Sequence, residues 1–222
     1  MDTPAKLLVV LGLLVGVALF VRLLRRRRRL AIGRIAHELG LQFSPQDPFE
    51  LPRRYAHFVL PSAGHSPRAE NVVYGQRGPF QVRAFDFLFE VGHGPRRVAR
   101  RCGVLTAESD LRFPSALLWH SRDTEHPPLA AAWVTRQAGP WLLCEGETFG
   151  PQVQEAFAAF ADEPVSIQFL GPTVLLSWPE RWRPEQFAGM VSRLEAAMQR
   201  LSARASRPQR QNRPAVESAQ GF

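Results

Sequence analysis

The segment Phe80–Val91 reads FQVRAFDFLFEV, and its alternation of side chains is typical of a β-strand. The two-residue period of a strand places Phe85, Phe87 and Phe89 on one face, and Asp86 on the other. We expect the three phenylalanines to lie in the core. Asp86 is then expected on the opposite, solvated face, without an identifiable partner for acid–base chemistry.

Shorter runs surround this strand and favour an antiparallel sheet. NVVYGQ at 71–76 is a strand, and Arg77-Gly78-Pro79 is a turn. A second turn at 92–95 precedes a third strand at 97–107. Strands separated by short turns that contain glycine are typical of β-hairpins. The segment 44–70, rich in proline, is expected to be irregular, with a helical turn at 49–56. A strand at 116–120 is expected inside an irregular stretch over 108–128.

The last third of the chain predicts a β-α-β-β-α unit. Strands are expected at 130–137, continuing into 141–145, and at 165–170 and 173–178, which Gly171-Pro172 joins as a hairpin. Helices are expected at 149–161 and 184–203, the second with an apolar face. A further helix at 30–40 ends at Gly40, a suitable C-cap residue. The predicted fold class is therefore α+β, with a mainly antiparallel sheet and two C-terminal helices.

The net charge of +8 over 222 residues is unevenly distributed. Residues 22–30 carry +6, residues 31–203 carry −1, and residues 204–222 carry +3. A nucleic-acid-binding domain usually carries a basic patch on the domain itself. The nearly neutral body therefore argues against specific nucleic-acid binding, although Arg96, Arg97, Arg100 and Arg101 lie close together in the sequence.

An apolar run of fifteen residues, Leu7–Val21, precedes the basic segment. At about 1.5 Å per residue it is shorter than the hydrocarbon core of a bilayer. Snorkelling of Arg22 extends it through Leu24, which predicts a transmembrane helix over 5–24. A cleaved signal peptide is the alternative, but its positive charges would come before the apolar run, and a small-residue cleavage site would follow it.

The basic juxtamembrane run 25–29 sets the expected orientation. Positive residues remain on the cytoplasmic side, so the N-terminus is expected outside and the soluble domain in the cytoplasm, at the inner membrane of a bacterium. The predicted membrane-interface residues, which can also bind anionic lipid, are Arg22, Arg25, Arg26, Arg27, Arg28 and Arg29. Gly12 and Gly16 form a G-x-x-x-G motif, through which the helix could form a homodimer.

The remaining domain organisation follows from composition. Residues 30–203 are expected to form a soluble α+β domain, with two lobes, 30–128 and 129–203, as an alternative. Residues 204–222 are expected to be a disordered basic tail, because they contain few apolar residues.

No established catalytic motif occurs in the sequence, so no catalytic, cofactor-binding or metal-binding residue is assigned. His120, Asp123, Glu125 and His126 match no metal-site spacing, and we expect them in a solvated loop. Cys102 and Cys144 form no C-x-x-C motif and are expected to be ordinary buried thiols. The polar side chains that an unrecognised enzyme would use are His57, His65, Asp86, His93 and Glu145.

Four short motifs carry a resemblance to a known group of proteins. They are the basic helix ending in Leu39-Gly40-Leu41-Gln42-Phe43, the segment Ala69–Gly75, the strand with Phe85-Asp86-Phe87, and the C-terminal strands with their helix over 165–201. With its anchor, the chain resembles a family of uncharacterised bacterial single-pass membrane-anchored proteins. That resemblance implies an anchored cytoplasmic domain with no assigned activity.

Three functions remain open from the sequence. The first is a non-enzymatic, membrane-tethered module that binds an unknown protein partner. The second is an unrecognised membrane-anchored enzyme. The third is a binder of anionic lipid or nucleic acid that uses the arginine run and the tail.

Overall fold

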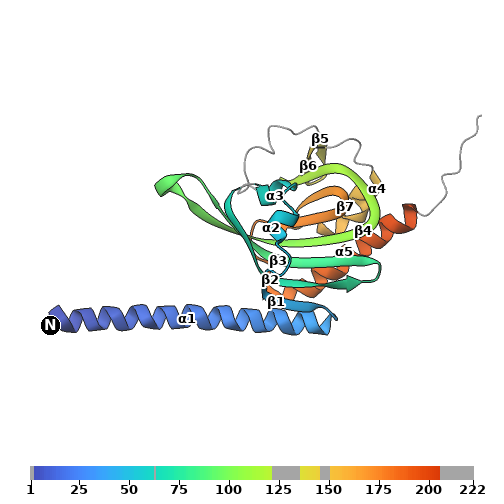
Figure 1. Ribbon diagram of the computed structural model, residues 1–222. Helices are drawn as coiled ribbons and strands as arrows, with labels where there is room; N and C mark the ends of the chain where they lie inside the picture. Colours follow the sequence, from blue (N-terminus) through green and yellow to red (C-terminus); the bar gives the residue numbers. More distant parts are fainter. Residues whose placement is uncertain (1–2, 63, 122–135, 146–150, 206–222) are drawn as a thin grey trace, which may run out of the picture.

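The computed structural model describes residues 3–62, 64–121, 136–145 and 151–205. Its centre is a seven-stranded antiparallel sheet in the order β1-β2-β3-β4-β6-β5, with β7 also paired to β4 (Figure 1). The strands are β1 (Gln42–Gln46), β2 (His65–Arg77), β3 (Phe80–Val91), β4 (Val98–His120), β5 (Arg136–Ala138), β6 (Trp141–Glu145) and β7 (Ser166–Trp178). The helices are α1 (Thr3–Glu38), α2 (Leu51–Arg54), α3 (Val59–Ser62), η1 (Gly94–Arg96), α4 (Pro151–Ala156), η3 (Ala158–Phe160) and α5 (Pro184–Ala205).

The sheet is covered on both faces. On one face Phe85, Phe87 and Phe89 pack in a cluster with Leu51 of α2 and its neighbour Tyr55, which confirms the phenylalanines as core residues. On the other face Val82 and Ala84 share a larger cluster with residues of α1 and α5. The predicted α+β class with a mainly antiparallel sheet is therefore confirmed.

Two predicted strand boundaries are wrong, because both strands continue through an irregularity in their pairing. Of the irregular stretch expected over 108–128, residues 108–120 belong to one 23-residue strand, β4, whose pairing with β7 shifts between Glu108 and Phe113, and residues 122–128 lie outside the described residues. The hairpin expected at Gly171 is instead a bend inside the single strand β7, where Gly171 has φ of 56°. Glycine adopts positive φ without the usual steric cost, so it permits both a turn and a bulge, and the sequence alone does not separate them.

The segment expected to be irregular contains short regular elements. β1, α2, α3 and the first half of β2 all lie within or beside residues 44–70. β1 pairs with β2 from Gln42 opposite Tyr74 to Gln46 opposite Glu70. The prolines did not prevent a short edge strand, because an edge strand needs only half of its backbone groups paired.

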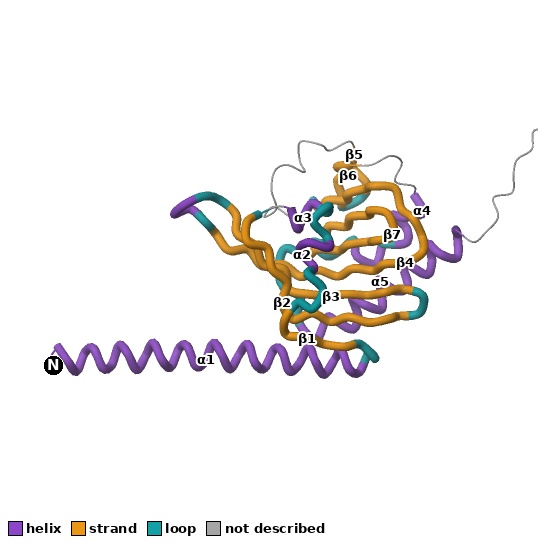
Figure 2. Tube along the Cα trace, viewed as in Figure 1, coloured by secondary structure: helices purple, strands orange, loops and turns teal. Residues whose placement is uncertain are grey.

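α1 is one continuous helix of 36 residues, about 54 Å long at 1.5 Å per residue. Its C-terminal part packs against the sheet through Ile32 and Ala36, which are fully buried, and Gly40 follows it with φ of +70°. Leu30, where the helix predicted over 30–40 begins, is 63% exposed. The N-terminal part projects beyond the sheet, and the β3–β4 tip points to the same side (Figure 2).

Within the part of the chain that the structure describes, no helix combines the length and the hydropathy needed to cross a membrane. The crossing predicted over 5–24 therefore remains a prediction.

The last third has the predicted helices with altered limits. α4 and the 3₁₀-turn η3 occupy the described part of the helix expected over 149–161, and α5 carries the expected apolar face, in which Phe187, Val191 and Leu194 are buried. The strand predicted at 130–137 is described only as β5, and most of the tail predicted at 204–222 lies outside the described residues.

Candidate functional site

The junction of α1 with the sheet is built around a buried carboxylate. The side chain of Asp86 is 1% exposed and accepts a hydrogen bond of 2.9 Å from Nη2 of Arg28 to Oδ1, while Nη1 of Arg28 bonds Oδ2. The same guanidinium donates to the carbonyl oxygen of Trp182 at 3.1 Å and lies 5.3 Å from the centroid of its indole ring. The expectation that Asp86 faces solvent is wrong, because the face opposite the phenylalanines is covered by α1 and the segment before α5.

Asn71 completes this junction. It has a left-handed backbone, with φ of 53°, at a register shift in the pairing of β2 with β3. Its Nδ2 donates to Oδ2 of Asp86 at 2.7 Å, and its Oδ1 accepts from Nε of Arg29 at 3.2 Å. Asparagine tolerates this conformation better than most residues, which suits it to bridge two strands and a helix.

A cavity of about 200 Å³ opens beside this junction. Six arginines line it together with Glu70, Asn71 and Leu88: Arg25, Arg28, Arg29, Arg68, Arg101 and Arg181. Burial, together with the neighbouring positive charges of Arg28, Arg101 and Arg25, lowers the pKa of Arg181 below its ordinary value despite the opposing effect of Asp86. We call this feature the arginine cavity.

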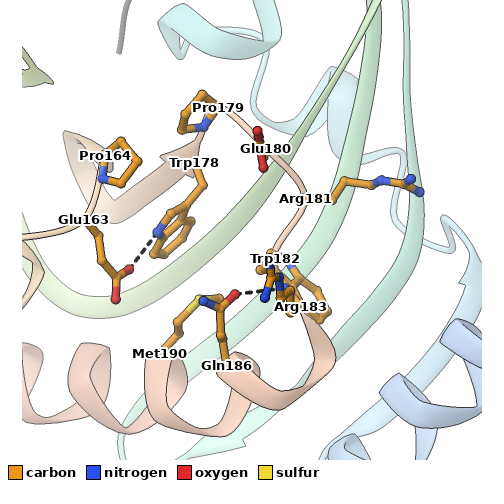
Figure 3. A pocket seen from close by; sticks show the side chains of 10 residues that line it. All are labelled: Glu163, Pro164, Trp178, Pro179, Glu180, Arg181, Trp182, Arg183, Gln186 and Met190. Carbon is orange, nitrogen blue, oxygen red and sulfur yellow. Dashed lines mark hydrogen bonds between the residues drawn. The ribbon is translucent and has the colours of Figure 1, made fainter. Parts of the chain in front are cut away.

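A larger, open groove of about 680 Å³ lies between the end of β7 and the start of α5 (Figure 3). Trp178 donates from Nε1 to Oε2 of Glu163 at 2.9 Å across it. Trp182 stacks on Phe187 with ring centroids 4.7 Å apart, and its buried indole N–H has no hydrogen-bond partner among the described residues. Two prolines and Met190 complete an apolar lining with polar edges. We call this feature the tryptophan groove.

A separate polar network lies on the opposite face of the sheet. Glu108 accepts from Tyr55 at 3.0 Å and forms ion pairs with Arg83 at 2.8 Å and Arg54 at 3.0 Å. Burial alone would raise the pKa of Glu108, but the hydrogen bonds from both arginines outweigh it and hold the pKa below its ordinary value. Burial raises the pKa of Tyr55. These contacts fix α2 against the sheet, although the buried Nε of Arg83 has no hydrogen-bond partner among the described residues.

The structure does not bring the predicted enzyme candidates into one place. His65 and His93 lie together, with ring centroids 5.2 Å apart, but both are exposed near the β3–β4 tip. His57 is exposed after α2, and Glu145 ends β6. Asp86 bonds Arg28 and Asn71 rather than a histidine.

The expected metal-like cluster also separates. His120 is buried at the end of β4, where Nε2 lies 3.3 Å from the carbonyl oxygen of Ala161, so its expected place in a solvated loop is wrong. Its sequence neighbours Asp123, Glu125 and His126 lie outside the described residues. Among the described residues, no three side chains of the metal-ligating types gather in one group. Cys102 and Cys144 are buried thiols.

The predicted interface arginines have divided roles. Arg28 and Arg29 bond the domain, and Arg25 lines the arginine cavity, whereas Arg22, Arg26 and Arg27 are exposed and bond no residue that the structure describes. A Cβ added at Gly12 or Gly16 would meet no described atom within 4 Å, so the face of α1 that carries these glycines is open.

Sequence reasoning missed the partners that come from elsewhere in the chain: Arg68, Asn71, Arg181 and Trp182. Asn71 stood in a short motif without an assigned role. The signal for Arg181 and Trp182 was Arg181-Trp182-Arg183, a basic and aromatic triplet between two prolines, and no signal indicated Arg68.

Comparisons with known proteins bear on the fold. No family model matches the chain. No curated protein matches it either. Among solved structures, it is similar to the mycobacterial trehalose monomycolate transport factor A, TtfA, with a TM-score of 0.54 and 17% sequence identity. The alignment covers 79% of this chain and 93% of that one. At this identity, the similarity establishes a shared fold.

Proposed function

We propose that this chain is a membrane-anchored, non-enzymatic accessory protein of the bacterial inner membrane. Its α1 enters lipid with the N-terminus outside, and its folded domain binds a protein partner on the cytoplasmic side. The structural neighbour is a transport factor by name, and an accessory role in transport is the corresponding proposal for this chain.

One observation carries the proposal: a single helix has two environments. From Val10 to Leu24 the large apolar side chains of α1 are 39–68% exposed, whereas from Arg28 onward the helix is bonded into the domain. A soluble protein rarely exposes so large a contiguous apolar surface, and such surfaces mark sites of contact with lipid or protein. The arginines between the two parts match the positive-inside pattern.

The Arg28–Asp86 contact gives the anchor a mechanical role. Because α1 has no break between its exposed and packed parts, the domain is held in one orientation relative to the exposed segment. The β3–β4 tip, with exposed Arg96 and Arg97, points toward the same side as the N-terminal end of α1 (Figure 1). A bilayer around the exposed segment would therefore meet a basic surface of the domain.

Membrane attachment is tested by alkaline carbonate extraction of membranes from cells that express the full chain. We expect the wild-type chain to resist extraction, and the variant Leu13→Arg/Val17→Arg to be released, because a charge at lipid depth is costly. Leu30→Arg is the matched control, since Leu30 is equally exposed on the same helix beyond the arginine run. Release of the wild type, or equal behaviour of the two variants, would refute attachment through α1.

Crossing is tested separately from attachment. In Thr3→Cys, an impermeant maleimide should label the new thiol in intact spheroplasts, because the N-terminus is proposed to lie outside. Labelling only after lysis would show that α1 does not cross with this orientation. A periplasmic reporter fused to the C-terminus should be inactive.

The tryptophan groove is the proposed contact for the protein partner, because its open lining combines two prolines and the edges of two mostly buried tryptophans with the charged side chains of Glu180, Arg181 and Arg183. A photo-crosslinking residue at Gln186, inside the groove, should capture a defined partner in intact membranes. The same residue at Arg200, on the exposed side of α5, should not. Identical products from both positions would exclude the groove as the contact.

A further inference from the structure

The arginine cavity has a strong excess of positive charge. Its six arginines face the carboxylate of Glu70 and the buried Asp86, which leaves an excess of four positive charges around a space of about 200 Å³. Arg28 is committed to Asp86, and Arg29 bonds Asn71. Arg68 makes only a 4.0 Å contact with Glu70.

Three arginines of the cavity remain uncommitted. The guanidinium groups of Arg25, Arg101 and Arg181 form no ion pair or hydrogen bond with any residue that the structure describes. They come from three different elements: α1, β4 and the segment before α5. Burial and neighbouring cations lower the pKa of Arg181 despite the opposing effect of Asp86, so the carboxylates present do not fully offset the positive charge around this side chain. A guanidinium cluster drawn together from separate elements, without enough carboxylates, is suited to binding an external anion.

We propose that the arginine cavity binds a phosphate group. Guanidinium forks match the geometry of phosphate oxygens and can bind them in bidentate fashion, and arginines are the preferred residues for that recognition. The inference rests on the proposed function for its source of ligand: the cavity lies where α1 leaves the domain, at the level of lipid headgroups if α1 enters a bilayer. A phospholipid headgroup and a free phosphate share the chemistry.

The two uncommitted arginines outside α1 provide the test, because they can be changed without touching the anchor. The full chain in a neutral detergent and phosphate-free buffer is titrated with inorganic phosphate by calorimetry. We expect Arg101→Gln/Arg181→Gln to weaken phosphate binding at least about tenfold. Arg112→Gln/Arg200→Gln is the control: it removes the same charge from exposed arginines away from the cavity, and should bind like the wild type. Unfolding midpoints of both variants establish that they are folded.

A second titration distinguishes the sources. Short-chain phosphatidylglycerol that binds the wild type, competes with inorganic phosphate and fails to bind the cavity variant supports a lipid headgroup. Binding of inorganic phosphate alone, lost in the same variant, supports a free phosphate. Absence of phosphate binding, or an equal loss in the cavity and control variants, overturns the proposal. These titrations need no bilayer, so they are independent of the carbonate extraction. If the wild-type chain is released by carbonate but still binds phosphate, membrane attachment is refuted and the phosphate site remains supported.

Discussion

Replacing Asp86 with asparagine should weaken the packing of α1 against the sheet and lower the free energy of unfolding. The change keeps the size of the side chain and the hydrogen bond from Asn71, but it removes the charge that Arg28 bonds with both terminal nitrogens. Removing one partner of a buried ion pair costs about 3–5 kcal/mol. The side chain of Arg28 is 20% exposed, so water compensates part of the loss and we expect about 3 kcal/mol. That is a large share of a typical domain stability of about 5–15 kcal/mol.

The measurement is a double-mutant cycle on the full chain in detergent, with denaturant unfolding followed by tryptophan fluorescence. Asp86→Asn, Arg28→Met and the double variant give the coupling energy, which we expect at about 2 kcal/mol. Arg27→Met is the matched control, because Arg27 is exposed on the neighbouring position of the same helix. A coupling energy below about 0.5 kcal/mol would refute the role of this pair in docking α1.

Three further predictions concern the core. Gly103→Ala should lower the free energy of unfolding by about 1–3 kcal/mol in denaturant titrations, because a Cβ there would overlap Cδ1 of Trp182; an unchanged midpoint would contradict that packing. Glu108→Gln should cost about 1–3 kcal/mol at neutral pH. Because the folded pKa of Glu108 is lowered, its contribution is complete above the ordinary value of 4.5 and is lost as pH falls through the folded pKa, so the wild type and variant should converge in acid unfolding curves. The thiol of Cys144, whose pKa burial raises, should react with iodoacetamide far more slowly in the native than in the unfolded protein; equal rates would show that it is accessible.

The sequence predicts the parts of the fold that depend on local periodicity. The face with Phe85, Phe87 and Phe89 follows from the two-residue period, and the apolar face of α5 follows from the helical one. The route of β7 does not follow, because Gly171 with a following proline satisfies a tight turn and a bulge equally well. Its bend is set by β4, which runs beside it from Gly103 opposite Trp178 to Leu118 opposite Ile167.

The site was less predictable than the fold, because its charges pair across long sequence separations. When β3 is considered alone, Asp86 is predicted to be solvated. The alternation of side chains places it on the face opposite the phenylalanines, but it does not indicate which other elements cover that face. The covering residues are Arg28, 58 positions earlier, and Trp182, which follows β7. Of the residues in this contact, only Arg28 belonged to a pattern that the sequence analysis singled out. That pattern, the arginine run, was interpreted as a membrane signal.

The arginine run carries more information than a topology signal needs. Positive-inside orientation depends on the number of charges near a span and not on their angular position. Docking depends on position: Arg25, Arg28 and Arg29 are spaced i, i+3 and i+4, so they share one face of α1, and that face is the one that meets Asp86, Asn71 and the arginine cavity. The intervening Arg26 and Arg27 form no hydrogen bond or ion pair with the residues that the structure describes. One run of five consecutive arginines therefore has two roles. Some of its side chains dock α1 on the domain, and the others add positive charge near the predicted membrane span. Replacing Arg26 and Arg27 should alter orientation in the membrane, and replacing Arg28 or Arg29, which bond the domain, should alter the stability of the domain.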